Sequence, residues 1–291
     1  MFAVFFAANS AQAETGLTIE ITKGVETAVP IAIVPFGWQG RSAKSAVNFS
    51  SVIQADLARS GVFKTLTERD MLTKPTAADK VRFRNWRALG QEYLVIGQIN
   101  ETAGRYQVQF QLFDVYKGEQ LLGYRLTVTA NELRRTAHHI SDLVYEKLTG
   151  KKGVFSSRIA YITTSIKANK QKTYKLLVAD ADGFNPRIIA SSKEPLMSPA
   201  WSPDSKKIAY VSFKNNRSDV FVKYVFQNTN PIKLPKFDGI ASSPTWHPDG
   251  KSLALTLSKG GNKDIYLYNF DSKKLKRLTT NIAIDTEASF S

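Results

Sequence analysis

Apolar residues follow two kinds of spacing in the first half of the chain. Pro30–Phe36 and Tyr93–Ile99 are short apolar runs that suit buried strands. Ala46–Ser60 instead carries apolar residues at helical spacing and is followed by Gly61, a common helix terminator. This alternation of strand and helix signals predicts an α/β domain with a mixed sheet over residues 14–152.

The same domain shows a hairpin pattern followed by a long helix. Tyr106–Val115 alternates polar and apolar positions, and Gln120–Ala130 is the expected partner strand. Asn131 is then the predicted N-cap of a helix that runs to Leu148 and ends before Gly150. Shorter elements are expected as strands at Leu17–Ile21 and Val62–Leu66 and as a helix at Asn85–Leu89.

After residue 152 the helical spacing stops and a repeated phrase dominates the pattern. The residues from Ser198 to Ala209 return from Ser243 to Ala254, 45 residues later, with Trp and Pro-Asp at matching positions. A period near 45 residues with strand-like content is typical of β-propeller blades. The chain is therefore expected to be a two-domain α+β protein in which residues 153–291 form propeller blades.

Each repeat is expected to contain four strands, with its tryptophan on the innermost strand and packed between neighbouring blades. In one repeat the strands are predicted at Met197–Trp201, Lys207–Phe213, Ser218–Phe226 and Ile232–Leu234. In the next they are predicted at Pro244–Trp246, Ser252–Leu257, Asp264–Phe270 and Leu275–Leu278. Pro-Asp should form a tight turn between the first two strands, in which the Asp carboxylate accepts backbone amides and Gly250 suits the last position.

The two ends of the repeat region depart from this pattern. Arg158–Tyr161 matches Lys207–Tyr210 without a preceding Pro-Asp phrase, so the first blade is expected to lack its innermost strand. Glu287–Ser291 matches the start of another phrase. The expected blades cover about 155–191, 196–236 and 242–280, with the start of a fourth at 286–291. Because closed propellers have about four to eight blades, we expect a C-terminally truncated, open arc with an exposed edge strand.

The N-terminus has the pattern of an export signal. Met1–Ala8 is apolar, and Ala11-Gln12-Ala13 fits the small-x-small cleavage rule. Residues 1–13 are therefore predicted to be a signal peptide, with Glu14 as the first mature residue. A buried N-terminal strand is the alternative interpretation of the same run.

Composition narrows the chemistry that the chain can perform. Its 291 residues carry a formal net charge of +15, which favours an anionic partner, yet no nucleic-acid recognition motif accompanies the charge. The absence of cysteine excludes disulfides, thiolate metal sites and cysteine nucleophiles. The sequence also lacks the Gly-x-Ser-x-Gly, phosphate-loop, His-Glu-x-x-His and dinucleotide motifs. No catalytic residue, metal site or cofactor is predicted.

Histidines and one acidic turn are the remaining candidates for a site. His138 and His139 are adjacent on the predicted helix, where one should face the core and the other solvent. His247 occupies a turn position with no evident partner. The segment Asp180–Gly183 resembles the start of a calcium loop but lacks the later ligands, so a hairpin turn explains it better. Structural roles are preferred for all of them.

The tandem Trp and Pro-Asp phrases are similar to the WD40-like (PD40) repeats of the TolB family. Three stretches of the first domain share the resemblance: Val29–Phe36, Val95–Gln98 and Val144–Gly150. Pro195–Asp204 is similar to the start of the family's second blade. The resemblance covers the whole chain and implies an α/β domain followed by a propeller of six blades, of which about three are present.

The same resemblance implies a non-enzymatic adaptor in the periplasm. Proteins of this family link the outer-membrane lipoprotein Pal with the C-terminal domain of the inner-membrane protein TolA. The resulting Tol–Pal system maintains outer-membrane integrity and draws the envelope inward at division, and some colicins exploit it. No cofactor or nucleic acid is implied, and contact with membranes is expected through partner proteins only.

Two contact sites follow from the resemblance. TolA is expected to bind the first mature residues, since a free alternating strand can add to the edge of a partner's sheet; they are Glu14, Thr15, Gly16, Leu17, Thr18, Ile19, Glu20 and Ile21. Pal is expected to bind the loops before the innermost strands, at one opening of the disc; these comprise Glu194, Pro195, Leu196, Ile240, Ala241, Ser242, Ser243, Asp285, Thr286 and Glu287. An internal strand and plain connections are the respective alternatives.

Two other functions stay open from the sequence. Similar repeats gate prolyl-oligopeptidase-like hydrolases, in which case this chain would be a fragment without its catalytic domain. A Gly-x-Ser-x-Gly segment after the propeller would identify that class. The basic surface would alternatively suit peptidoglycan or another anionic polymer, which salt-dependent binding to purified sacculi would test.

Overall fold

The computed structural model describes residues 28–214 and 217–291. The predicted signal peptide and the predicted TolA-binding residues lie outside this part of the chain. The chain forms two compact units, the first ending at Ile140 and the second beginning at Ser141. The boundary between them therefore falls within helix α3 (Leu133–Thr149).

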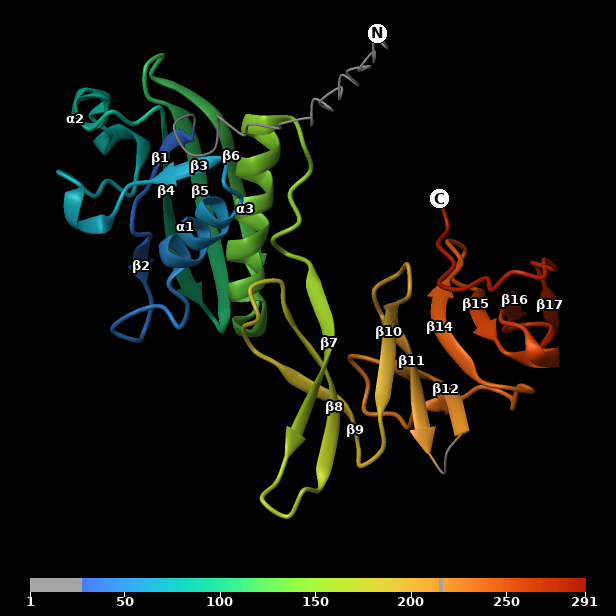
Figure 1. Ribbon diagram of the computed structural model, residues 1–291. Coiled ribbons are helices and arrows are strands. Elements are labelled where there is room, and N and C mark those ends of the chain that lie inside the picture. Colours follow the sequence, from blue (N-terminus) through green and yellow to red (C-terminus); the bar gives the residue numbers. More distant parts are fainter. Residues whose placement is uncertain (1–27, 215–216) are drawn as a thin grey trace, which may run out of the picture. The chain divides into compact units, whose positions relative to one another are not determined.

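The first unit is built on one mixed sheet (Figure 1). Its strands run in the order β3-β1-β4-β5-β6, and β2 pairs with β4. The pairs that β1 makes with β3 and β4 are parallel, whereas β4 with β5 and β5 with β6 are antiparallel. The strands are β1 (Val29–Ile33), β2 (Gly37–Gln39), β3 (Phe63–Thr65), β4 (Tyr93–Thr102), β5 (Arg105–Asp114) and β6 (Glu119–Val128). The mixed sheet predicted from the sequence is confirmed.

Two short helices accompany this sheet. Helix α1 (Phe49–Arg59) begins at Asn48, whose side chain accepts a hydrogen bond from the Ser51 amide at 3.1 Å. It ends before Gly61, which has a φ of 71°. Helix α2 (Phe83–Ala88) buries Trp86 completely. Single turns of 3₁₀ helix form at Glu68–Asp70, Ala78–Lys80 and Ala130–Glu132.

The start of the long helix differs from the prediction. Thr129, rather than Asn131, caps the helical segment: the Glu132 carboxylate accepts the Thr129 amide at 2.8 Å and the Thr129 hydroxyl at 2.7 Å. These bonds, led by that of the Thr129 amide, lower the pKa of Glu132. Asn131 lies inside the 3₁₀ turn that leads into α3, because the reciprocal Thr-x-x-Glu capping box outcompetes a lone Asn. Gly150, with a φ of 72°, follows the helix as predicted.

The second unit consists of three antiparallel sheets, as the repeat pattern predicts. The first has three strands, β7 (Arg158–Ile166), β8 (Lys172–Asp180) and β9 (Arg187–Ser192). The second has four, β10 (Leu196–Trp201), β11 (Lys207–Lys214), β12 (Arg217–Tyr224) and β13 (Ile232–Lys233). The third also has four, β14 (Ala241–Trp246), β15 (Ser252–Leu257), β16 (Asp264–Asn269) and β17 (Leu275–Arg277). The sheets do not close into a ring, so the unit is an incomplete propeller.

Apolar side chains bury the faces between neighbouring sheets. Leu176 of the first sheet packs in one cluster with Ile208 and Tyr210 of the second. Val222 of the second sheet packs in another with Leu255 of the third. Each blade is therefore stabilised mainly by burial against its neighbours.

The repeated phrase forms the turn that its sequence predicts. The Ser205 amide bonds the Ser202 carbonyl at 2.8 Å, and the Gly250 amide bonds the His247 carbonyl at 2.9 Å. Asp249 Oδ1 accepts the Lys251 amide at 2.7 Å. Pro-Asp therefore sets the middle of a four-residue turn between the innermost and second strands in both blades.

Trp246 joins two blades in the predicted way. Its side chain is buried, its indole Nε1 donates to the Ala200 carbonyl at 3.1 Å, and its ring stacks on Phe270 at a centroid distance of 5.3 Å. Ala200 belongs to β10 and Trp246 to β14, so this bond links the innermost strands of neighbouring sheets.

Candidate functional site

The predicted Pal-binding residues lie around the starts of β10 and β14 and after β17. The Ala241 amide at the start of β14 donates to the Ser218 hydroxyl of β12. Ser218 pairs with Phe213, whose amide donates to the Pro195 carbonyl just before β10. The loops that lead into β10 and β14 are therefore at the same end of the second unit. The structure brings the first two predicted groups, Glu194–Leu196 and Ile240–Ser243, to this end, and residues 285–287 follow at the next repeat position. We call these three groups the inner-strand loops.

Backbone and side-chain bonds hold the inner-strand loops in a repeated arrangement. The Ala241 amide donates to the Ser218 hydroxyl at 2.7 Å, at the start of β12 in the preceding sheet. At the equivalent position of the next repeat, the Asp285 amide donates to the Lys263 carbonyl at 2.9 Å, just before β16. The Ile240 amide also donates to the Ser258 hydroxyl at 2.7 Å. The loops at Ala241 and Asp285 are thus tied to the blade before them, and Ile240 is also tied to its own blade.

Exposure divides the predicted residues into two kinds. Leu196 is 4% exposed and Ala241 is 1% exposed, so both pack inside the unit and offer a partner little surface. Ile240 is 55% exposed, and Glu194, Thr286 and Glu287 are exposed as well. A large apolar side chain among polar neighbours is the usual composition of a protein-binding patch. Ile240 is therefore the strongest single contact candidate in these loops.

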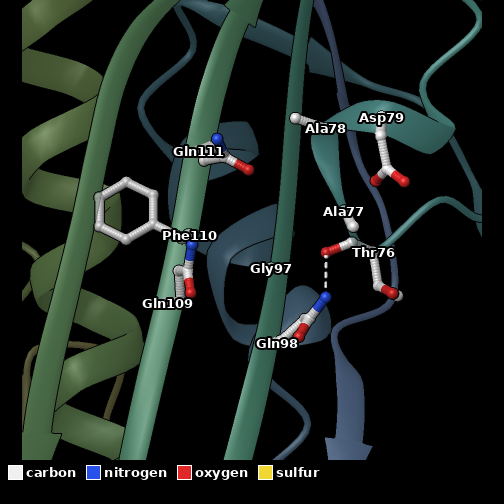
Figure 2. Close-up of a pocket in the computed structure, with 9 residues that line it drawn as sticks. All are labelled: Thr76, Ala77, Ala78, Asp79, Gly97, Gln98, Gln109, Phe110 and Gln111. Carbon is white, nitrogen blue, oxygen red and sulfur yellow. Dashed lines mark hydrogen bonds between the residues drawn. The ribbon is translucent and has the colours of Figure 1, made fainter.

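A pocket of about 330 Å³ opens on the first unit, between Thr76–Asp79 and strands β4 and β5 (Figure 2). The Gln98 side chain is part of the pocket lining, and its Nε2 donates to the Thr76 carbonyl at 3.0 Å. The rest of the lining is formed by Gly97, Gln109, Phe110 and Gln111. The polar side chains of this lining are the Thr76 hydroxyl, the Asp79 carboxylate and the amides of three glutamines.

The histidines take structural positions. His138 is buried with Nδ1 2.7 Å from Asp56 Oδ2, and His139 is exposed, so one faces inward and one outward as predicted. The prediction that His247 has no partner is wrong. Its Nδ1 lies 2.9 Å from Asp249 Oδ1, and its ring meets Phe290 edge to face at 4.9 Å. Phe290 is 43 positions further along the chain, which is why the sequence around His247 gave no sign of it.

The acidic segment at residues 180–183 is a hairpin turn, as expected. It connects β8 with β9, the Gly183 amide donates to the Asp180 carbonyl at 2.8 Å, and Asp182 Oδ1 accepts the Phe184 amide at 3.0 Å. The Asp182 side chain therefore helps to hold the turn.

Sequence reasoning missed one anchoring residue at the start of the second unit. Asp142, on α3, accepts the Phe155 amide at 2.6 Å and the Ser156 amide at 3.1 Å. A Cβ at Gly153 would come within 2.5 Å of the Asp142 Cα, so only glycine fits there. In the sequence, this anchor is visible only as a single Asp on the predicted helix and a Gly after the helix. No local pattern links these two residues.

The geometry defines a class of protein: an α/β domain joined to an open β-propeller whose blades present loops at one end. A family model described as the TolB amino-terminal domain matches residues 17–121, and one described as the TolB beta propeller domain matches residues 145–291. The chain belongs to the TolB family. The resemblance inferred from the repeated phrase and the first domain is confirmed.

Individual relatives agree with this assignment. The Tol-Pal system protein TolB of Nitrosococcus oceani is 55% identical over 208 residues, covering 71% of this chain and 48% of the relative. That of Thioalkalivibrio sulfidiphilus is 44% identical over 231 residues, covering 79% of this chain and 53% of the relative. The crystal structure of TolB from Acinetobacter baumannii superimposes with a TM-score of 0.78 at 36% identity, over 91% of this chain and 64% of that one.

The chain spans about half the length of the curated relatives it matches. Within the part of the chain that the structure describes, none of the helices combines the length and the apolar character needed to cross a bilayer.

Proposed function

We propose that this chain is a non-enzymatic periplasmic adaptor of the Tol–Pal system. It binds Pal through the inner-strand loops of its propeller and TolA through residues 14–21, and so links the two membranes of the envelope. The observation that carries the proposal is the presence of both TolB-type units in one chain whose relatives are named Tol-Pal system proteins. Maintenance of the outer membrane and its constriction at division would follow from that link.

The described residues support an adaptor more than an enzyme. The inner-strand loops offer exposed polar side chains around Ile240, which suits recognition of a protein surface. The pocket on the first unit carries no arrangement of nucleophile and base. The first domain matches the TolB amino-terminal domain, which favours the adaptor over the prolyl-oligopeptidase-like hydrolase.

The Pal site is tested by two matched isoleucine variants. Ile240 in an inner-strand loop is 55% exposed, and Ile232 on the short outer strand β13 is 53% exposed. Burying an isoleucine contributes about 1.5–3 kcal/mol, so Ile240→Asp should weaken Pal binding by roughly tenfold or more in calorimetry. Ile232→Asp should leave it unchanged. Equal affinities for the two variants would rule out the inner-strand loops as the Pal site.

The TolA site is tested by removing residues 14–21. The deletion should abolish binding of the TolA C-terminal domain, because the strand that would extend the partner's sheet is lost. Pal binding should stay intact or strengthen, because the propeller is untouched. Undiminished TolA affinity in calorimetry would refute this part of the proposal.

A further inference from the structure

The sheet of the first unit has one apolar face and one face that carries glutamines. Val108, Phe110 and Leu112 of β5 are 0% exposed. Gln109 and Gln111 alternate with them along the strand, so their side chains lie on the opposite face. Both line the pocket of about 330 Å³ on the first unit (Figure 2). The accessible face of β5 at this point is therefore made of side-chain amides.

The strand register extends this polar surface across three strands. Gln98 of β4 is directly opposite Gln109, and Gln109 is directly opposite Arg125 of β6. In the next row, Gln111 is opposite Gly123. Because directly opposite residues share a face, these positions form one surface. A second pocket of about 290 Å³ shares Gln109 and Gln111 with the first and extends over β6. We call the combined feature the amide groove, defined by Asp79, Gln98, Gln109, Gln111, Gln120 and Arg125.

A glycine keeps the amide groove open on β6. Gly123 lies in the interior of this strand, where glycine weakens pairing and often marks the close approach of another group. Its backbone is outside the left-handed region, so the strand geometry itself does not require glycine. A Cβ at this position would come within 2.5 Å of Gln120 Nε2. The missing side chain therefore leaves room in the groove rather than allowing a turn.

The glutamines of the groove keep hydrogen-bonding capacity after their mutual bonds are made. Gln111 Nε2 donates to Gln120 Oε1 at 2.5 Å, and Arg125 Nη2 donates to Gln109 Oε1 at 3.4 Å. Each of these bonds uses one group of an amide that offers two donor hydrogens and two acceptor lone pairs. A peptide group has one N–H and one C=O, which such an amide can bind together. The groove therefore suits a ligand that contains peptide groups.

One charge of each sign stands at the two ends of the groove. Asp79 lies on the far side of β4 from β5, and Arg125 lies on the edge strand β6 (Figure 2). Both residues are exposed, and within residues 28–214 and 217–291 neither forms an ion pair. An ammonium group would pair with the carboxylate and a carboxylate with the guanidinium. The charges therefore favour a ligand with a positive and a negative end.

The width of the groove sets the length of such a ligand. Neighbouring strands are about 4.8 Å apart, so the distance from β4 to β6 is about 10 Å. An extended peptide rises by about 3.3 Å per residue. About three residues therefore span the glutamines, and a fourth reaches towards Asp79.

We propose that the amide groove binds a short, extended peptide with free termini. Its ammonium group lies at Asp79, its carboxylate at Arg125, and its peptide groups bond the glutamines between them. A glycan fits less well, because the two aromatic residues of the lining, Phe110 and Tyr124, stack on each other at 5.7 Å on the opposite face of the sheet. This site belongs to the first unit alone and is independent of the proposed Pal and TolA contacts.

Calorimetric titration of the chain with tetra-alanine tests the proposal, because this peptide offers only a backbone and two charged termini. Binding is expected. The same peptide acetylated at its N-terminus and amidated at its C-terminus should bind about tenfold more weakly or worse, since two charge-assisted hydrogen bonds are lost. Absence of binding, or equal binding of the capped peptide, would overturn the proposal.

Matched variants locate the peptide in the groove. Arg125→Gln should weaken tetra-alanine binding by about tenfold. Arg187→Gln, which removes the same charge from an exposed position on β9 in the second unit, should leave it unchanged. Gly123→Leu fills the groove and should abolish binding, while the circular dichroism spectrum stays that of the parent. Equal affinities of the two arginine variants would contradict the assignment.

The orientation of the peptide is tested by pairing a variant with a modified ligand. Asp79→Asn should weaken binding of free tetra-alanine but not of the form acetylated only at its N-terminus, which has no ammonium group to lose. A similar loss with both ligands would rule out the proposed contact at Asp79. Chitotriose serves as the competing ligand, and binding of this glycan as tight as that of the peptide would identify a glycan site instead.

Discussion

At the scale of single residues, the repeated turn shows how a serine and an aspartate side chain fix the backbone. Asp204 Oδ1 lies 2.6 Å from the Ser202 hydroxyl that donates to it, and it also accepts the Lys206 amide at 3.1 Å. The hydroxyl bond, followed by the amide and the nearby lysines, lowers the pKa of Asp204 below its usual value. In the next repeat the Lys251 amide is the main cause of a lowered pKa at Asp249.

This lowered pKa predicts a dependence on acid. Because the folded pKa lies below the unfolded value of about 3.9, ionised Asp204 stabilises the fold above that pH. The contribution is lost as pH falls through the folded pKa. The free energy of unfolding of Asp204→Asn should thus be lower than that of the parent at neutral pH, and the two should converge as the pH falls below the unfolded pKa of about 3.9. Urea titrations across this range measure it, and a constant difference would contradict the assignment.

Backbone strain in the same turn gives a second prediction. Ser205 has a φ of 55°, and Gly250 holds the equivalent position with a φ of 69°. A left-handed conformation costs a side-chain-bearing residue about 1–2 kcal/mol, and glycine avoids that strain. Ser205→Gly should therefore raise the free energy of unfolding by roughly 1 kcal/mol. Gly250→Ser is the reciprocal control and should lower it by a similar amount. Thermal unfolding of both variants checks the pair.

A buried carboxylate in the first unit yields a third prediction. Asp56 is 1% exposed, and its two oxygens lie 2.8 Å from Arg59 Nη2 and 2.7 Å from His138 Nδ1. Removing one member of a buried, bonded group typically costs about 3–5 kcal/mol. Asp56→Ala should lower the free energy of unfolding by that order, whereas the exposed Asp70→Ala should change it by less than about 1 kcal/mol. Chemical denaturation would show whether the two variants differ.

At the scale of elements, the sequence located most strands because their signals are local. The predicted strand at Ser252–Leu257 coincides with β15, and the other blade strands agree within a few residues. The alternation of apolar residues and the Pro-Asp turn were sufficient to locate the strands of the blades. The start of α3 was missed because the sequence offers two N-caps, Asn131 and Thr129. The reciprocal hydrogen bonds between Thr129 and Glu132 favour Thr129. The role of Asp142 and the contact between His247 and Phe290 were missed because the partner residues are distant in sequence.

Ion pairs between the third and fourth strands also escaped the sequence analysis, although they repeat. Asp264 on β16 pairs with Arg277 on β17 at 2.7 Å, and Asp219 on β12 pairs with Lys233 on β13 at 2.7 Å. The carboxylate of Asp264 is fully buried, whereas that of Asp219 is 12% exposed. The hydrogen bond that Arg277 donates to Asp264 raises the pKa of Arg277. The pair on the third sheet should therefore matter more to stability than the pair on the second.

Alanine variants of the two cations test which ion pair contributes more to stability. Arg277→Ala leaves a buried carboxylate without its partner and should lower the melting temperature clearly. Lys233→Ala removes a more exposed cation and should have little effect. Differential scanning fluorimetry ranks the two. An equal or reversed ranking would mean that burial of Asp264 does not control the strength of its pair.

At the scale of the whole molecule, both units could be predicted because each carries its own sequence signature. The open inner edge of β7 was inferred from a missing phrase, and the exposed Ile159 shows it directly. The indole of Trp201, whose Nε1 has no hydrogen-bond partner among the described residues, and the left-handed backbone of Glu287 could not be foreseen, since both depend on the three-dimensional structure.

The open edge predicts how the chain behaves in concentrated solution. An exposed apolar edge strand associates readily, and a lysine placed there opposes the association. Ile159→Lys should therefore reduce self-association in light scattering, whereas Ile232→Lys on β13 should not. If both variants associate like the parent, the edge of β7 is not the surface through which chains meet.

Helix α3 decides where this protein can be divided experimentally. A fragment starting at Ser141 would be severed inside the helix, and its first four amides would lose their acceptors. The frayed turn would include Asp142, which positions Phe155 and Ser156 ahead of the first blade. A propeller expressed alone should consequently begin no later than Thr129, so that the fragment contains the whole helix and its cap.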